Sequence, residues 1–429
     1  MDSSTEIVHR RTGERCVRID HPSGLTIFVS PKPGYRSSYA VFAARYGSID
    51  TVFRADGEDQ DTAVPAGIAH YLEHKLFESE DGDAFARYAK TGASANAYTS
   101  FDRTAYLFSC TDRLEESLEI LLDFVQSPYF TEETVRKEQG IIGQEIRMCE
   151  DSPSRRVLFN LLRALYHRHP VRVDIAGTVE SIAEITPELL YRCYHAFYNL
   201  RNMTLAVAGN VTPEQVLAVA DKTLRAAPDR TIRRTPVAEP REAKEPRVEE
   251  RMPVSAPLFY LGFKEEADGV NPRPPEELAA AEVLLELLAG QASPLYARLL
   301  ERGLINDSFG TEYFAGPGYG VYLFAGESSD PDAVAKAIHD EIARLRREGV
   351  PSDEFGAGRN ALYGRLIASL NDVESCADML ISDAFDRREP YSLIDAAAAL
   401  TPEAVTRALS RSLFPEQAAL SVVSPEKDA

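Results

Sequence analysis

The sequence predicts an α+β protein of two homologous halves, each a mixed β-sheet with helices packed on it. Three observations support this prediction. The chain has 429 residues, which is enough for more than one domain. Its middle is rich in proline, as semi-rigid linkers are. Similar successions of strands and helices lie on either side of that middle.

The proline-rich middle sets the predicted domain boundaries. From residue 228 to residue 257 the chain carries six prolines, with dense arginine and glutamate between them. Repeated proline breaks helices and favours extended backbone. We therefore expect one half over residues 1–227, a linker over 228–256 and a homologous half over 257–429.

Two pairs of segments indicate that the halves arose by duplication. Thr186-Pro187 and Thr401-Pro402 each open a helix that an apolar strand follows. Threonine is a good N-cap, and proline suits the first helical position. A second pair, the helices that follow Thr131 and Ser352, matches at an offset of 221 residues. Chance similarity between helices is the alternative, but the matching order of elements favours duplication.

Composition argues against several classes of partner. The formal net charge is −20, which disfavours nucleic acid and anionic membranes because both need a basic surface. No apolar run approaches the ~18 residues of a membrane span, and the N-terminus lacks the apolar core of a signal peptide. The five cysteines are scattered, which is typical of reduced thiols. We therefore expect a cytoplasmic protein.

The segment from His70 to His74, with the sequence HYLEH, carries the clearest chemistry. On a helix, His70 and His74 lie one turn apart on one face, where two imidazoles can bind one Zn²⁺. Glu73 lies on the same side, within reach of water beside the metal. The pattern HxxEH is the inverzincin signature. A helical histidine is more often a surface residue, but the apolar setting of this helix favours a metal site.

A catalytic zinc site needs a third protein ligand, and a carboxylate from another helix is expected. Glu145 in the segment EQGIIGQEI is the candidate, 71 residues after His74. Glu138 lies two helical turns before it on the same face, where it can orient a ligand. Paired glutamates at this spacing are commonly a solvated helix face. Beside HxxEH, the metal interpretation is preferred.

HYLEH followed by EQGIIGQEI resembles the pitrilysin or insulinase family of zinc peptidases, which includes mitochondrial processing peptidase. The resemblance extends over most of the chain, including GASANAYTSFDRTAYLF. In its length and its linker near the midpoint, the chain is similar to proteins of the short bacterial branch, which have two homologous halves. Within that branch, KLFE after the motif is most similar to the YmfH-type proteins, which are associated with elongation factor P modification.

The resemblance implies a role for each motif residue. His70, His74 and Glu145 match the ligands of one zinc ion per chain. Glu73 matches the general base, and Glu138 matches the acid that the family carries upstream of the third ligand.

The resemblance also implies how a peptide is held. Asn96 and Ala97 match an edge strand that pairs with the substrate backbone. Such an edge offers free N–H and C=O groups to an extended peptide. Without the family resemblance, a turn or strand-end position is an equally good interpretation of Asn96.

The second half lacks the metal set. At the offset of 221, Glu145 matches Leu366 and Glu138 matches Arg359. The resemblance implies a zinc-binding, catalytic half over residues 1–227 and a non-catalytic half over 257–429 that closes over the first as a clamshell. In active relatives this half supplies an Arg and a Tyr that hold the substrate carbonyl, but Asn306 stands where the Tyr is expected. Nearby substitutes for substrate binding are Arg298, Arg302 and Tyr313.

These inferences predict a zinc-dependent endopeptidase that cleaves peptides or unfolded segments, with Glu73 as the general base. The alternative is a non-catalytic assembly subunit or peptide-binding subunit of a heterodimer in the same family. The missing Tyr favours help from a partner, either a homologous zinc-free subunit or a second copy of the chain. His167 and His169 are weaker metal candidates.

Overall fold

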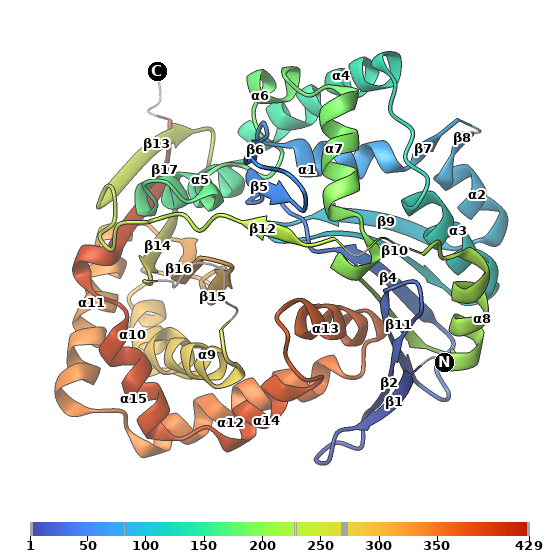
Figure 1. The fold of residues 1–429 in the computed structure, drawn as a ribbon. Helices are drawn as coiled ribbons and strands as arrows, with labels where there is room; N and C mark the ends of the chain where they lie inside the picture. The colour runs from blue at the N-terminus through green and yellow to red at the C-terminus, as the bar shows by residue number, and fades with distance from the viewer. Residues whose placement is uncertain (1–2, 81, 227, 229, 267–272, 427–429) are drawn as a thin grey trace. The chain divides into compact units, whose positions relative to one another are not determined.

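The computed structural model describes residues 3–80, 82–226, 228, 230–266 and 273–426 (Figure 1). The chain folds into two compact units, and each is assembled from three segments of sequence. Unit 1 comprises Met1–Ile146, Asp174–Thr235 and Ile367–Tyr391. Unit 2 comprises Arg147–Val173, Pro236–Leu366 and Ser392–Ala429.

Unit 1 contains a seven-stranded sheet in the order β1-β2-β3-β11-β4-β10-β9. Its pairs are antiparallel except for β3 and β11, which run parallel. Because β9 stands at one end of this order, it is an edge strand. The strands are β1 (Ser3–Val8), β2 (Arg15–Asp20), β3 (Thr26–Pro31), β4 (Ser38–Ala44), β9 (Ser94–Thr99), β10 (Thr104–Cys110) and β11 (Met203–Gly209).

Helices cover the faces of this sheet. Every residue of β4 and β11 is buried, as expected for strands covered on both sides. The helices of unit 1 are α1 (Ile68–Leu76), α2 (Ala84–Thr91), α3 (Leu114–Val125), α4 (Glu132–Glu150, which runs on into unit 2), α6 (Val179–Ala183), α7 (Pro187–Phe197), α8 (Pro213–Thr223) and α13 (Val373–Phe385). Short pieces complete it: β5 (Val52–Ala55), β6 (Thr62–Ala63), β7 (Glu78–Ser79), β8 (Gly82–Asp83), β12 (Ile232–Arg234) and η2 (Leu200–Asn202).

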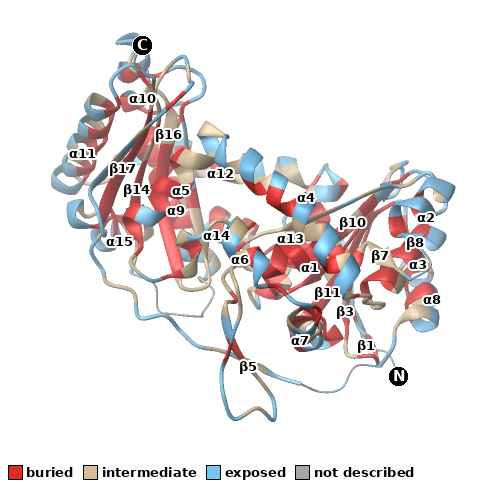
Figure 2. Cartoon of the chain, turned by 90° about the horizontal axis from the view of Figure 1, so that it is seen from above, coloured by how far each residue is buried: buried red, intermediate tan, exposed pale blue. Residues whose placement is uncertain are grey.

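Unit 2 contains a five-stranded sheet in the order β13-β17-β14-β16-β15. Figure 2 shows the central strands of both sheets as largely buried. The strands are β13 (Arg247–Met252), β14 (Leu258–Lys264), β15 (Gly310–Gly316), β16 (Tyr319–Glu327) and β17 (Ala418–Pro425). The helices are α5 (Pro153–Leu165), α9 (Pro275–Ala289), α10 (Pro294–Glu301), α11 (Pro331–Glu348), α12 (Ser352–Ser369), α14 (Ser392–Ala399), α15 (Pro402–Arg411), η1 (Pro170–Arg172) and η3 (Pro415–Gln417).

The compact units differ from the predicted boundaries at 1–227, 228–256 and 257–429 because two helices are exchanged. α5 packs on β17 and β14, and its Val157 is buried with Met252 and Val423. α13 packs on β11 and β4 of the other sheet. The predicted linker also contains strands β12 and β13. Pro246 and Pro253 flank β13, an edge strand, where proline is tolerated.

The repeat is in register at an offset of 220, one residue less than the sequence comparison suggested. α4 and α12 begin at Glu132 and Ser352, and α5 and α13 begin at Pro153 and Val373. The exchange of α5 and α13 is therefore itself repeated.

Two local expectations had different outcomes. Thr186 caps α7 as predicted, because its hydroxyl accepts the Leu189 N–H at 3.3 Å. Thr401 stands at the N-cap of α15, but its side chain makes no cap hydrogen bond.

The stretch Pro275–Glu301 has the hydropathy of a membrane span, with a mean of 1.3 over 18 residues. Since 67% of that window is buried inside the protein, it is typical of a core helix.

Candidate metal centre

Helix α1 carries HYLEH and is held by close backbone contacts. It begins after Gly67, which has a φ of 88°. A Cβ atom at Gly67 would lie 2.4 Å from the carbonyl oxygen of Ala176, so only glycine fits this approach. The Ser181 hydroxyl donates to the carbonyl of Ala66 at 2.8 Å. The segment after Ala176 thereby fixes where the motif helix starts.

α1 is buried along almost its whole length: eight of its nine residues are buried, and His74 is partly exposed. The Tyr71 hydroxyl donates to the carbonyl of Val135, which ties α1 to α4. Lys75 has no exposed surface and pairs with Glu78. Polar side chains so deeply placed need defined partners, which restricts their positions.

His70, His74 and Glu145 lie together, with one potential ligand atom from each within 4.8 Å of the others. His70 Nε2 is 3.4 Å from Glu145 Oε1, and His74 Nε2 is 3.5 Å from Glu145 Oε2. A tetrahedral zinc site with bonds of about 2.0–2.1 Å places its ligand atoms roughly 3.3–3.4 Å apart. Two nitrogens and one carboxylate at this spacing fit a zinc ion.

Glu138 orients one of the two imidazoles. His74 Nδ1 lies 3.0 Å from Glu138 Oε1, and the glutamate side chain is only 13% exposed. If Nδ1 donates to the carboxylate, Nε2 keeps its lone pair toward Glu145. His70 differs, because its Nδ1 is buried with no hydrogen-bond partner among the described residues.

Three carboxylates give this site a negative field. Burial lowers the pKa of His74, but its hydrogen bond to the Glu138 carboxylate and the charges of Glu73, Glu138 and Glu145 more than offset that effect. The pKa of His74 therefore stands above its ordinary value. A field that favours a proton on His74 favours a cation in the same place.

Glu73 is buried, with 8% of its surface exposed, and one of its oxygens is engaged. The Thr99 hydroxyl donates to Glu73 Oε2 at 2.6 Å. Within the described residues, Glu73 Oε1 makes no hydrogen bond. One oxygen is thus fixed, and the other can exchange a proton.

A cavity of about 530 Å³ adjoins the cluster, and Glu73, His74 and Glu138 line it. Asn96 and Ala97 of the edge strand β9 line it too. Asn96 Oδ1 accepts the Ala97 N–H at 2.9 Å. The remaining lining is largely apolar or charged: Phe77, Phe85, Ile141, Lys137, Glu78, Glu80 and Asp83.

Comparison with known proteins places the chain in a family. The model for the insulinase family (peptidase family M16) matches residues 55–179, and the model for the M16 inactive domain matches residues 184–362. The uncharacterized zinc protease YmfH of Bacillus subtilis (strain 168) is 39% identical over 412 residues, covering 94% of this chain and 95% of the relative. The chain belongs to peptidase family M16. The predicted insulinase relationship and α+β class are confirmed.

Two further similar proteins, one of them a solved structure, match most of the chain. An M16-like peptidase from Alicyclobacillus acidocaldarius, known as a crystal structure, has a TM-score of 0.91 at 35% identity and covers 99% of both chains. The mitochondrial-processing peptidase subunit beta of Arabidopsis thaliana is 26% identical over 390 residues, or 84% of this chain and 71% of that one.

The second half of this M16 chain carries a different cluster where the repeat places the metal residues. At the offset of 220, Arg365 matches Glu145, and Gly358 matches Glu138, so the earlier matches to Leu366 and Arg359 are off by one residue. Arg365 pairs with Glu286 of α9, and its Nη2 lies 3.8 Å from Glu282. Glu282 and Glu286 are four apart on α9, as His70 and His74 are on α1. A guanidinium thus stands among carboxylates, which is not a zinc ligand set.

The substitutes for the expected Tyr have other partners. Arg298 Nη2 lies 2.8 Å from Glu341 Oε2, and Glu341 is almost fully buried. The Tyr313 hydroxyl donates to Glu265. Asn306 donates to Glu327 at 2.9 Å and accepts from Ser308, so it stabilises a turn. Arg302 lines a surface groove beside Arg298. Their predicted role in substrate binding stays a prediction.

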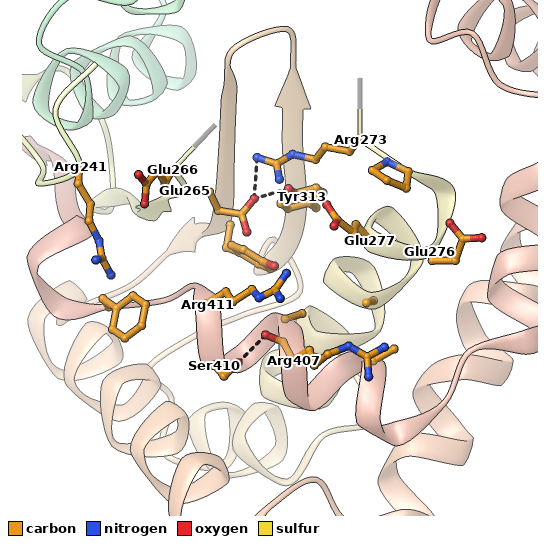
Figure 3. A pocket seen from close by; sticks show the side chains of 16 residues that line it. Arg241, Glu265, Glu266, Arg273, Glu276, Glu277, Tyr313, Arg407, Ser410 and Arg411 are labelled. Carbon is orange, nitrogen blue, oxygen red and sulfur yellow. Dashed lines mark hydrogen bonds and ion pairs between the residues drawn. The ribbon is translucent and has the colours of Figure 1, made fainter. Parts of the chain in front are cut away.

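A larger cavity, of about 710 Å³, lies within unit 2 (Figure 3). Figure 3 shows Arg273 and Arg411 reaching toward it from opposite sides, with Arg273 paired to Glu265. Among the described residues that line it, arginines and glutamates are equal in number, so this part of the lining shows no clear preference for an anion or a cation. Its charged lining is Arg241, Arg273, Arg407, Arg411, Glu265, Glu266, Glu276 and Glu277.

His169, a weaker metal candidate, has a structural setting. Its Nδ1 accepts the Val171 N–H at 3.2 Å, and its Nε2 lies 3.2 Å from the carbonyl of Pro317. Burial lowers the pKa of His169 to about 4. The backbone N–H of His167, the other weaker candidate, donates to Glu239 at 2.7 Å.

Sequence reasoning missed Thr99. It lies on β9 two residues after Ala97, and alternate strand residues share a face. The two-residue alternation of a strand could have placed Thr99 on the same face as Ala97, but nothing in the sequence alone predicts its hydrogen bond with Glu73.

Proposed function

We propose that this chain is a zinc-dependent endopeptidase that cleaves peptides or unfolded segments. The observation that carries the proposal is the cluster of His70, His74 and Glu145, with Glu73 in the same cavity. Membership in family M16, whose relatives include proteins named zinc proteases, supports it.

The chemistry divides between the metal and Glu73. A zinc ion held by His70, His74 and Glu145 would polarise the scissile carbonyl and lower the pKa of a water molecule toward about 7. Glu73 Oε1 takes a proton from the attacking water and passes it to the leaving amine. Glu138 keeps the His74 ring in orientation throughout.

The edge strand β9 supports a peptide substrate. An extended chain can add to a free sheet edge through main-chain hydrogen bonds. Asn96 Oδ1 occupies the Ala97 N–H, so substrate docking displaces that side chain before the N–H can bind a peptide carbonyl. We therefore expect Asn96→Ala to change KM more than kcat.

Glu73→Gln tests the proposal. The amide cannot take the proton, whereas both imidazoles and Glu145 remain. We expect a normal zinc content, measured by mass spectrometry of the metal, and loss of peptide-library cleavage. His70→Ala and Glu145→Ala should lose zinc as well. A zinc-loaded wild-type chain that cuts no peptide, alone or with a partner, would contradict the proposal.

We also propose that the chain gains activity from a partner. Asn306 replaces the expected Tyr, and the loss of one group that stabilises the developing oxyanion lowers rates by ~10²–10³. The partner is a homologous zinc-free subunit, or a second copy of the chain as the commonest form of closed assembly. The relative named a subunit of mitochondrial-processing peptidase supports pairing. Equal activity per zinc in the isolated chain and a co-purified pair would remove the reason for a partner.

The inactive-domain match does not favour a non-catalytic chain. It covers residues 184–362, whereas His70, His74, Glu73 and Glu145 lie outside it. A link to elongation factor P modification and a cytoplasmic location stay predictions.

A further inference from the structure

We propose that Thr99 is a positioning residue that fixes the carboxylate of Glu73 for proton transfer. The inference rests on the proposed peptidase function and adds a residue to it. Its basis is the hydrogen bond from Thr99 Oγ1 to Glu73 Oε2, at 2.6 Å, between strand β9 and helix α1.

The direction of this hydrogen bond follows from the next hydroxyl. Thr104, which is fully buried, donates its proton to the carbonyl of Tyr46 at 2.9 Å. Thr104 Oγ1 therefore offers only lone pairs to Thr99, at 3.5 Å. The single proton of Thr99 has a closer and charged acceptor in Glu73, and hydrogen bonds to a carboxylate are the stronger kind.

Two buried tyrosines belong to the same group of hydroxyls. The hydroxyls of Tyr106 and Tyr198 lie 2.9 Å apart, and that of Tyr198 is hydrogen-bonded to the side chain of Thr104. Buried hydroxyls with satisfied hydrogen bonds keep a defined geometry. Glu73 is thus held at Oε2 by Thr99, while the residue lines the cavity beside the metal cluster.

The same strand links the base to the proposed substrate edge. Ala97 and Thr99 share one face of β9, and Ala97 lines the cavity beside the metal cluster. A peptide that adds to β9 is therefore placed relative to Glu73 by one rigid element. A misplacement of about 1 Å between reacting groups can cost on the order of 10²-fold in rate.

The test compares Thr99→Val with Thr99→Ser in the zinc-loaded chain, or in the active pair if a partner is needed. Valine keeps the shape and removes the donor. We expect kcat to fall about ten- to a hundred-fold in Thr99→Val, because a hydrogen bond to a charged group is lost. We expect KM within about two-fold of wild type, since substrate contacts remain. Thr99→Ser should recover most of kcat.

Thr91→Val is the matched control. Thr91 is also half-buried in unit 1, and its hydroxyl donates to the carbonyl of Tyr88 at 3.1 Å, away from the cluster. The Thr91→Val variant should have the kcat of wild type. Zinc content should be equal in all variants, and the visible spectrum of the Co²⁺-substituted protein should match wild type.

A double-mutant cycle gives a readout that is independent of turnover. Unfolding of wild type, Thr99→Val, Glu73→Ala and the double variant, all zinc-loaded, should reveal a coupling of roughly ten-fold in the unfolding equilibrium constant. Absence of coupling overturns the inference. Wild-type kcat in Thr99→Val overturns the inference alone, whereas a wild-type chain without any peptidase activity overturns the proposed function as well.

Discussion

Replacement of Glu138 tests how the zinc ligand His74 is held. The carboxylate lies 3.0 Å from His74 Nδ1 and is mostly shielded from water. Glu138→Ala removes both the hydrogen-bond acceptor and the negative charge. Glu138→Gln removes the charge but keeps an acceptor oxygen of the same reach. The two variants therefore separate orientation from electrostatics.

The expected magnitude follows from the position of Glu138 behind a ligand. Loss of such an outer partner typically costs 10- to 100-fold in metal affinity, or about 1.4–2.7 kcal/mol. Glu138→Ala should lie at the upper end, because it leaves the His74 Nδ1 proton without an acceptor in a largely buried site. Glu138→Gln should lie at the lower end.

Zinc affinity is measured by competition with a chromophoric chelator at constant pH. Glu133→Gln is the control, since Glu133 is an exposed acid on the same helix α4. It should bind zinc as wild type does. Unchanged affinity in Glu138→Ala would refute the proposed support of His74.

Three further outcomes are expected. Gly67→Ala should destabilise the chain by more than roughly 1–2 kcal/mol and lower its zinc content, because φ is positive at Gly67 and a Cβ would meet the carbonyl of Ala176. Calorimetry measures the stability and metal analysis the zinc content. Wild-type stability in this variant would contradict the reasoning. Arg365→Ala should lower the free energy of chemical unfolding by about 1 kcal/mol, since the side chain is half exposed, and leave the zinc content unchanged. Loss of zinc from this variant would contradict the assignment of the metal site to the first half. Burial raises the pKa of Asp383 to about 6, so the folded state holds a proton that the unfolded state releases above about pH 4. Stability should therefore fall as pH rises from about 4 to 6, and less so in Asp383→Asn; equal pH slopes would argue against it.

The sequence was informative about the metal residues because their spacing is local. His70, Glu73 and His74 are fixed relative to one another by one helical turn, and Glu138 and Glu145 by two. That these two helices meet came from a family resemblance. The structure brings His70, His74 and Glu138 into contact with each other or with Glu145 at 3.0–3.5 Å. Glu73 lines the same cavity as His74 and Glu138.

Contacts between distant elements could not be predicted in the same way. The apolar periodicity of α5 and α13 shows that each buries one face, but not which sheet receives it. The exchange of these helices between units therefore appears only in the structure. Thr99 was missed for a similar reason, since its bond to Glu73 depends on how β9 lies against α1.

Zinc K-edge absorption of the zinc-loaded chain tests the central claim most directly. We predict one zinc per chain with two imidazole nitrogens at about 2.0–2.1 Å and oxygen ligands at about 2.0–2.2 Å. The imidazole signal should disappear or halve in His70→Ala and His74→Ala. Sulfur scattering at about 2.3 Å, or a spectrum that His70→Ala and Glu145→Ala leave unchanged, would contradict a zinc ion held by His70, His74 and Glu145.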